Sequence, residues 1–491
     1  MTKILIWPRS NLIFLGISKI LKKRIDCDLF LAVDDNNTSK KFYLNQDIVN
    51  FKKIWFYGDY VNKKFDDVDL NYLKKFEIKY DINLWNIIYS DRVFYNHNIY
   101  HTFSKNEILK IVQYSCKFFE HLLNESDPDI LIMEPDAFHQ DVILKAMCKK
   151  LSIKILTIFS LRIGKRIMIS SEPDHLDNQL NKNNFTELKS FNTLLQNSLE
   201  YSKAQKFLFK NHKVDIKKQV SAYVRFLTNR NIKNYSKFFS NYGKNKLKLF
   251  YYPSLYLLKS YFRLNYLNKI SMKKLPKNKK FVYFSLHFQP ERSTLIQAAY
   301  WTNQLEIIQH IAKSIPIDYV LCVKEHPLMK NTHWHKSSFY KQMISIPNVQ
   351  LIHHSIPNNE CVQKSSLVIT ITGSSSLESL FHKKPSIVFA DTMYSNLSDV
   401  HKIINLTDLS KLIKTCINSK VSLKDLNQFV YSIEKNSIEF ELPLLYFEIL
   451  HKFQSNGFLS ISSISISDFK NFLNEKEKSF EIITDEFVHR F

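Results

Sequence analysis

Short apolar runs alternate with amphipathic stretches along the first third of the chain. The runs have the length of buried strands, and the stretches between them repeat their apolar residues at helical spacing. This alternation predicts a parallel sheet with helices on both faces. The expected strands are 4–7, 28–33, 53–57, 129–133 and 154–159, and the expected helices are 12–23, 105–124 and 137–151.

A second alternating unit begins after the Lys- and Pro-rich stretch 273–280. Two such units joined by a linker predict an α/β fold of two Rossmann-like domains that face each other across a cleft. Ligands of such sheets bind beyond the carboxyl ends of the strands. The expected strands of the second unit are 281–285, 319–324, 349–352, 367–371 and 386–389, and its expected helices are 294–314, 358–364, 375–382 and 408–417.

The length of the chain leaves room for two further segments. A chain of 491 residues with 45% hydrophobic content can hold two globular α/β domains and additional elements. We expect an N-terminal Rossmann-like domain at 1–170, a basic, aromatic-rich helical insert at 171–280, a C-terminal Rossmann-like domain at 281–420 and a helical C-terminal tail at 421–491.

The cysteines and the apolar runs indicate the cellular compartment. The six cysteines are scattered, without a CxxC pair or a Cys/His cluster, which argues against a zinc module or a disulfide framework and fits a reducing cytoplasm. The apolar run at the N-terminus is too short for a signal peptide, and no run reaches the roughly 18 residues of a membrane-spanning helix. We therefore expect a soluble or peripheral protein.

Most of the net charge of +23 lies in one segment of the chain. Residues 201–280 hold 21 Lys/Arg and a single acid, Asp215, among many aromatic residues. The segment is either a solvated helical face or a surface that docks on anionic lipid headgroups, where each basic residue contributes about 1 kcal/mol. No RNP motif, helix-turn-helix signature or zinc finger supports nucleic-acid binding. We favour an anionic membrane surface as the partner and expect no nucleic acid.

An apolar strand that opens directly into a helix carries the first candidate site. Free backbone N–H groups, small hydroxyl side chains and a glycine at such a junction are typical of a phosphate-binding turn. The alternative is an ordinary serine N-cap, with Glu378 completing a capping box. The candidate residues are Thr372, Gly373, Ser374, Ser375, Ser376 and Glu378.

The second candidate site follows another buried strand. Lys324, Glu325 and His326 come at its carboxyl end, and Pro327 prevents its continuation. His326 can donate to a phosphate oxygen and Lys324 adds positive charge, although a structural histidine is the alternative. Because both candidate sites end strands of one parallel sheet, they are expected to face the same cleft and to bind a nucleotide phosphate together.

A third strand end, expected beside the other two, carries His287, Gln289 and Glu291. These side chains can bind sugar or ribose hydroxyls, and the alternative is a loop that only caps the following helix.

In this order, the motifs Ser285-Leu-His-Phe-Gln-Pro-Glu291, Lys324-Glu-His-Pro327 and Thr372-Gly-Ser-Ser-Ser-Leu-Glu378 resemble the bacterial capsule-polysaccharide biosynthesis glycosyltransferases. These are GT-B enzymes related to transferases of Kdo and sialic-acid type. The resemblance covers mainly residues 281–391, with weaker similarity at 84–92 and 161–166. It implies that His326-Pro327 and Ser374-Ser375 hold the phosphate of a CMP-linked donor.

The catalytic carboxylate is expected from the N-terminal domain. Glu134 and Asp136 follow the strand 129–133, where one of them would deprotonate the acceptor hydroxyl or act as a nucleophile. A solvated loop acid is the alternative for each. The absence of the Asp/Glu-Asp/Glu-Gly triplet of sialyltransferases leaves the base open. Arg162 and Arg166, after the next strand, would bind a sugar-acid carboxylate or the phosphate.

The sequence thus predicts a metal-independent glycosyltransferase of capsule or O-antigen biosynthesis. It would transfer an ulosonic acid, of Kdo or nonulosonic type, from a CMP-activated donor to a hydroxyl of a glycan or lipid-linked glycan, without a further cofactor. The alternatives are a UDP- or GDP-sugar transferase, a nucleotide-sugar epimerase, a glycerophosphotransferase, and a membrane-associated polysaccharide-assembly factor without activity. The expected location is the inner face of the bacterial cytoplasmic membrane.

Overall fold

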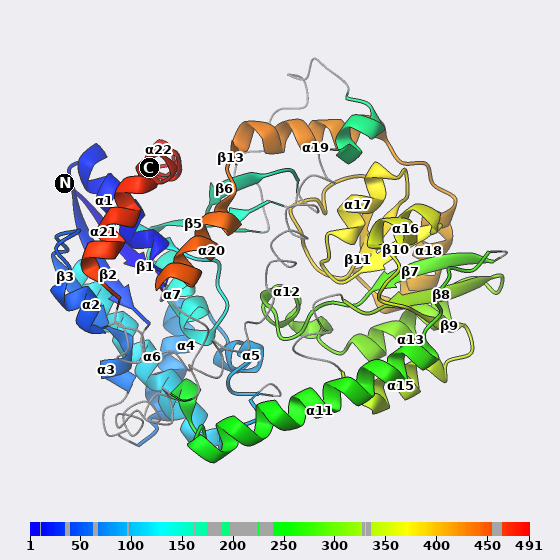
Figure 1. Ribbon diagram of the computed structural model, residues 1–491, viewed down its shortest axis with the longest axis horizontal. Helices are drawn as coiled ribbons and strands as arrows, with labels where there is room; N and C mark the ends of the chain where they lie inside the picture. Colours follow the sequence, from blue (N-terminus) through cyan, green and yellow to red (C-terminus); the bar gives the residue numbers. More distant parts are fainter. Residues whose placement is uncertain are drawn as a thin grey trace.

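The chain forms two α/β lobes, each built round its own sheet (Figure 1). The computed structural model describes residues 1–9, 11–34, 40–61, 67–95, 98–161, 163–173, 189–196, 224, 239–277, 279–326, 329, 335–453 and 464–491.

The first sheet has the strand order β13-β6-β5-β4-β1-β2-β3. Its five N-terminal strands are parallel, and they end close to the residues predicted from the apolar runs. β6 pairs antiparallel with β5, and β13 pairs antiparallel with β6. The strands are β1 (Thr2–Trp7), β2 (Cys27–Val33), β3 (Lys53–Phe56), β4 (Ile130–Met133), β5 (Lys154–Ser160), β6 (Arg166–Ser170) and β13 (Ile438–Glu439).

Different parts of the chain cover the two faces of this sheet. Ile4 and Ile6 of β1 point to one face and Leu5 and Trp7 to the other, because side chains alternate along a strand. The first face packs on α1, α2 and the C-terminal helices, and the second on α3 to α7. The helices are α1 (Ile13–Arg24), α2 (Lys40–Asn45), α3 (Tyr57–Val61), α4 (Leu70–Tyr80), α5 (Leu84–Ser90), α6 (Lys105–Ser126) and α7 (His139–Lys150).

The second sheet is parallel throughout, with the order β12-β11-β10-β7-β8-β9. Two sheets of this type confirm the predicted α/β fold with two Rossmann-like domains. The strands are β7 (Lys280–Ser285), β8 (Tyr319–Lys324), β9 (Val349–Ile352), β10 (Leu367–Thr370), β11 (Ser386–Val388) and β12 (Val400–Lys402). The flanking helices are α12 (Arg292–Leu295), α13 (Gln304–Ser314), α15 (Ser337–Ile344), α16 (Asn358–Lys364), α17 (Ser375–Phe381) and α18 (Leu409–Ile417).

The predicted helix 294–314 is wrong as a single element. The chain instead forms α12, a 3-10 turn at Ala299–Trp301 and α13. Asn303 starts α13 anew, since its side chain accepts a hydrogen bond from the backbone N–H of Glu306. The break lets the chain between the two helices turn, and the Gln297 side chain there donates to the backbone carbonyl of Asp391.

A long helix, α11 (Lys246–Ile270), connects the two lobes along one side of the molecule (Figure 1). Near its start, Lys248 donates to the backbone carbonyl of Tyr100 in the first lobe. Near its end, Leu267 is buried in the core of the second lobe. The part of the basic insert from 201 to 238 lies outside the described residues, apart from Val224.

The C-terminal segment, expected as one helical tail, contributes to both lobes. α19 (Leu423–Asn436) joins a hydrophobic cluster with Leu161 and Met168 of the first lobe and Leu380 and Val388 of the second. The chain then returns through β13 to the first sheet. There α20 (Leu442–Phe453), α21 (Ile466–Glu475) and α22 (Glu477–His489) complete the core beneath β1. In Figure 1 these helices lie beside α1.

None of the helices in the described ranges combines the length and the hydrophobicity that a bilayer-spanning helix requires.

The packing of α22 on α1 depends on Gly16. A Cβ at this position would lie 2.3 Å from Cε1 of the Phe480 ring, which is almost completely buried. We predict that Gly16→Ala lowers the free energy of unfolding by about 1–3 kcal/mol, as overpacking does, although Ala favours a helix over Gly by about 1 kcal/mol. Urea denaturation measures this change. The double variant Gly16→Ala, Phe480→Leu should lose less free energy of unfolding than the two single variants lose in sum. Additive losses would contradict the contact between these residues.

Candidate functional site

The three strand-end motifs of the second lobe lie together. β10, β7 and β8 are neighbours, and Ser285 at the end of β7 stands beside Lys324 at the end of β8. The backbone N–H of Leu286 donates to the carbonyl of Lys324, at 2.9 Å. The hydroxyls of Ser285 and Ser375 are 2.8 Å apart. The structure therefore brings together the three segments that the sequence predicted to converge.

His287 connects the first of these segments to the turn after β10. Its Nε2 accepts a hydrogen bond from the backbone N–H of Thr372, at 3.2 Å. Gln304 fixes the backbone of His287, accepting from its N–H at 2.7 Å and donating to its carbonyl at 3.1 Å. The imidazole is thus held against the turn by groups from two different elements.

Gly373 is required by this close approach. A Cβ there would lie 2.6 Å from Oγ1 of Thr370 and 3.3 Å from Nε2 of His287. The Thr370 hydroxyl accepts from the backbone N–H of Gly373, and Tyr394 donates to the Gly373 carbonyl at 2.9 Å. Any larger residue would push the turn away from His287.

The hydroxyl groups of Ser374 and Ser376 do not make the hydrogen bonds of an ordinary serine N-cap. The Ser374 hydroxyl donates to Oε1 of Glu378 and makes no capping hydrogen bond, so the alternative of a serine capping box does not hold. Asn358 donates to the other carboxylate oxygen of Glu378, at 2.7 Å. The Ser376 hydroxyl donates to the Gly373 carbonyl. Glu378 therefore orders the turn rather than presenting its carboxylate to a ligand.

Glu325 also has a structural role, because its carboxylate is bonded to neighbouring groups of the protein. It accepts hydrogen bonds from Tyr340, from His335 at 3.1 Å and from the backbone N–H of His326 at 2.9 Å. Burial alone would raise the pKa of Glu325, but the hydrogen bond and charge of His335 outweigh it and hold that pKa below its ordinary value. The carboxylate shapes the loop that carries His326. Lys324 is buried at the strand end, and Pro327 lies outside the described residues.

Gln289 and Glu291 shape the loop after β7. The Gln289 side chain donates to the backbone carbonyl of Thr302. The carbonyl of Glu291 accepts from the N–H groups of Thr294 and Leu295 at the start of α12, and its carboxylate accepts from the Ser293 hydroxyl. Both side chains thus bond to the chain around α12, although Glu291 makes no side-chain capping hydrogen bond.

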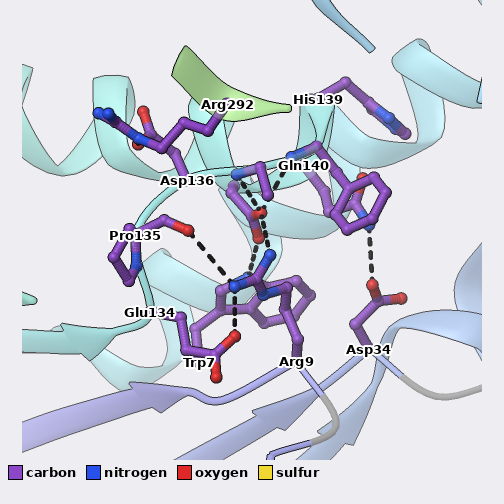
Figure 2. Close-up of polar contacts among 12 residues, drawn as sticks. Trp7, Arg9, Asp34, Glu134, Pro135, Asp136, His139, Gln140 and Arg292 are labelled. Carbon is purple, nitrogen blue, oxygen red and sulfur yellow. Dashed lines mark hydrogen bonds and ion pairs between the residues drawn. The ribbon is translucent and has the colours of Figure 1, made fainter. Parts of the chain in front are cut away.

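Glu134 lies at the carboxyl end of the first sheet, in a network centred on Arg9 (Figure 2). The Arg9 guanidinium pairs with Glu134 and with Asp141, and Asn11 donates to the second oxygen of Glu134. Asp141 is held in turn by the Trp7 indole N–H, at 2.7 Å. The Glu134 side chain keeps 19% of its surface exposed.

Asp136 joins the two lobes. One carboxylate oxygen accepts from Nε of Arg292, at 2.7 Å, and the other lies 3.3 Å from Nζ of Lys145. Burial tends to raise the pKa of Asp136, but the charges of Arg292 and Lys145 outweigh it and lower that pKa. A carboxylate between two cations is a poor proton acceptor. Asp136 is therefore better suited to joining the two lobes than to acting as a catalytic base. Arg92 donates beside it to the backbone carbonyl of Pro290, at 3.4 Å.

Arg166 belongs neither to the network around Arg9 and Glu134 nor to the ion pair between Asp136 and Arg292. Its guanidinium donates to the backbone carbonyls of Glu434 and Ser437 and to the Ser437 hydroxyl, so it fastens the end of α19 to β6. This engagement opposes the predicted role in binding a sugar acid or phosphate. Arg162 lies outside the described residues.

Asp34, at the end of β2, was missed by the sequence analysis. Its Oδ2 accepts from the Gln140 side chain at 2.8 Å, while Asp34 Oδ1 and Gln140 Oε1 are buried without a hydrogen-bond partner among the described residues. Burial is the main cause that raises the pKa of Asp34 to about 7. The signal that would have found it is an acid directly after a buried strand, the same rule that selected Glu134.

A second buried group that was missed is the pair Asp91–His139. The His139 ring nitrogen Nδ1 lies 2.7 Å from the Asp91 carboxylate, and Nε2 lies 3.1 Å from the Ser115 hydroxyl. All three side chains are buried among the aromatic residues of the first lobe, so they hold α6 and α7 together. Across the described ranges, no group of three or more His, Cys, Asp or Glu side chains is placed to hold a metal ion.

The raised pKa of Asp34 makes a testable contribution to stability. Between the ordinary carboxyl pKa of about 3.9 and a value of about 7, the folded state keeps a proton that the unfolded state has released. The free energy of unfolding therefore falls as the pH rises through this window. The Asn variant lacks this proton and its pH dependence. We predict that the free energy of unfolding of Asp34→Asn, relative to that of the unmodified chain, rises by about 1–4 kcal/mol from pH 5 to pH 8, measured by urea unfolding.

The matched control is Asp318→Asn, which removes the same charge from a side chain that is 57% exposed. Its effect should be similar at both pH values. An Asp34→Asn effect that is equal at pH 5 and pH 8 would contradict the coupling to this proton.

One protein-family model and several solved structures are similar to this chain. Residues 177–404 match the family model described as capsule polysaccharide biosynthesis protein. None of the curated proteins matches the sequence significantly. Several solved structures are distantly similar to it.

One is the β-Kdo 2,7-transferase KpsC of Thermosulfurimonas dismutans, with 12% identity and a TM-score of 0.31 over 68% of this chain and 90% of that one. Another is the UDP-GlcNAc 2-epimerase of Methanocaldococcus jannaschii, with 13% identity and a TM-score of 0.25 over 87% of this chain and 98% of that one. The UDP-GlcNAc 2-epimerase of Neisseria meningitidis shows 11% identity and a TM-score of 0.27 over 89% and 99%. Such distant likenesses carry no conclusion about activity. The match over residues 177–404 confirms the predicted resemblance to the capsule polysaccharide biosynthesis protein family, over a little under half of the chain.

Proposed function

We propose that this chain is a glycosyltransferase of capsule or O-antigen biosynthesis that binds its nucleotide-activated donor at the carboxyl end of the second sheet. The observation that carries the proposal is the contact among three strand ends, through Ser285 and Ser375 and through His287 and Thr372. A parallel sheet binds ligands at this edge. The family match over residues 177–404, which includes all three motifs, supports the biosynthetic role.

The second lobe supplies the charges and donors that a leaving nucleotide requires. When the bond between the anomeric carbon and the phosphate oxygen breaks, negative charge develops on that oxygen. Lys324, His326 and the backbone N–H groups of Ser374 and Ser375, which follow Gly373, would stabilise this charge without a metal ion. His287 is the positioning residue, because it holds the Thr372–Gly373 backbone at the strand end.

The first lobe supplies the carboxylates for the acceptor side. Of the two predicted residues, Glu134 suits proton transfer better, because Asp136 lies between Arg292 and Lys145 and has a lowered pKa. Glu134 would take the proton of the acceptor hydroxyl in an inverting transfer, or bond to the anomeric carbon in a retaining one. Arg9 sets its orientation in both cases.

The proposed donor is a CMP-linked ulosonic acid, because the His-Pro and Ser-Ser motifs resemble those of transferases that use CMP-sugars. UDP- or GDP-sugar transfer, nucleotide-sugar epimerisation and glycerophosphate transfer remain the alternative activities, and a polysaccharide-assembly factor is the alternative without catalysis. The proposed acceptor is a glycan or lipid-linked glycan, reached from the inner face of the cytoplasmic membrane. The 21 basic residues of 201–280 support this location.

Nucleotide specificity is tested by thermal shifts with CMP, CDP, UDP and GDP. We predict that CMP raises the melting temperature, and that His326→Ala abolishes this rise by removing a donor to the phosphate. The matched control is His310→Ala, a half-buried histidine on α13 outside the site, which should retain the full rise.

Two outcomes would contradict the proposal at different levels. Stabilisation by none of the four nucleotides, with activity intact in His326→Ala, would exclude the transferase. Stabilisation by UDP alone would exclude the CMP-linked donor and leave the rest of the proposal standing.

A further inference from the structure

The outward face of α11 is lined with large apolar side chains. Six of them have exposed fractions of 57–81%. At about 100° per residue, all six fall within about 120° of the helix circumference. They are Leu247, Phe250, Tyr251, Leu258, Tyr261 and Phe262, and they are called the α11 stripe below.

The opposite side of α11 packs on the protein. Leu249 and Leu267 are buried, and by helical spacing they lie on the side away from the stripe. The end of the helix is fastened by Asn268, whose side-chain oxygen lies 2.9 Å from Nε2 of His353. The stripe is therefore an outer face of a fixed helix, and the helix contacts both lobes.

The charge of α11 indicates what such a face contacts. Its 25 residues include five basic residues and no acidic one. Among them, Lys246, Lys259 and Lys269 are exposed. Exposed aromatic and aliphatic side chains on a helix with five basic residues and no acidic one are complementary to the headgroup region of an anionic bilayer. Several large apolar side chains exposed on one face of a helix mark a site of interaction.

We propose that the α11 stripe inserts into the headgroup region of an anionic membrane, with the neighbouring lysines on the lipid phosphates. This inference rests on the proposed function for its purpose, since a lipid-linked acceptor lies at such a surface. It goes further in naming the inserting residues and in placing α11, rather than basic charge alone, at the membrane. Because α11 contacts both lobes, docking would hold both at a fixed height above the bilayer.

The test is cosedimentation of the full chain with vesicles of phosphatidylcholine alone and of phosphatidylcholine with phosphatidylglycerol. We expect strong binding only to the anionic vesicles. The triple variant Leu247→Gln, Leu258→Gln, Phe262→Gln should bind them about tenfold more weakly or worse, because it removes half of the stripe. Adding Lys259→Glu should weaken binding by a further factor of about five, which corresponds to about 1 kcal/mol per basic residue.

The matched control is Ile78→Gln, Ile317→Gln, Ile404→Gln, which removes three side chains that are 72–105% exposed elsewhere on the surface. It should bind as the unmodified chain does. Equal binding by the α11 variant and this control would overturn the proposal, and so would equal binding to neutral and anionic vesicles. A change of the α11 variant from dimer to monomer, with vesicle binding unchanged, would overturn it in favour of contact between two copies of the chain.

A second measurement reports insertion directly. The six native cysteines are buried, so Leu258→Cys offers a selective position for an environment-sensitive fluorophore. Its emission should shift to shorter wavelength with anionic vesicles, while the same label at Ile404→Cys should not respond. No shift at position 258 would contradict insertion.

The CMP thermal shift of the α11 variant separates this inference from the proposed function. A retained nucleotide response with retained vesicle binding would refute only the role of α11. A lost nucleotide response in the unmodified chain would refute the proposed donor site, whatever the vesicles show.

Discussion

The ion pair between Asp136 and Arg292 is the interaction on which the arrangement of the site depends. Asp136 follows β4 of the first sheet, and Arg292 opens α12 at the end of the loop that follows β7 of the second. The pair is largely buried, so removing either partner would leave a charge without compensation and cost about 3–5 kcal/mol. Lys145 holds Asp136 from within its own lobe. The pair therefore fixes the relative position of the two strand edges.

The loop after β7 contacts a different part of the molecule at each of its two ends. At its start, His287 holds the Thr372–Gly373 turn, and at its end Arg292 contacts the first lobe. The Thr372–Gly373 turn and the carboxylates of the first lobe are thereby connected through the six-residue segment from His287 to Arg292. Gly373 permits the close approach of the turn, because a Cβ would collide with the Thr370 hydroxyl.

The strands and the meeting of the three motifs could be predicted from the sequence, because apolar runs define strand ends and parallel strands share one carboxyl edge. The hydrogen-bond partners of individual polar side chains could not be predicted from the sequence. Glu325 and Arg166 each look like ligand-binding residues. In the folded chain Glu325 bonds to His335, 10 residues away, and Arg166 bonds to the Ser437 carbonyl, 271 residues away. Helix 294–314 has a helical pattern but is interrupted before Asn303, where a capping side chain starts a new helix. Asp34 acquires its raised pKa mainly from burial in the folded lobe, with a smaller contribution from the charge of Asp141.

We propose that the donor phosphate binds at the turn after β10, facing the first lobe. A crystal structure of the chain with CMP tests it most directly. We predict phosphate density within hydrogen-bond distance of the backbone N–H groups of Ser374 and Ser375 and of the His326 side chain. A nucleotide bound at the carboxyl end of the first sheet, near Arg9 and Glu134, would contradict it.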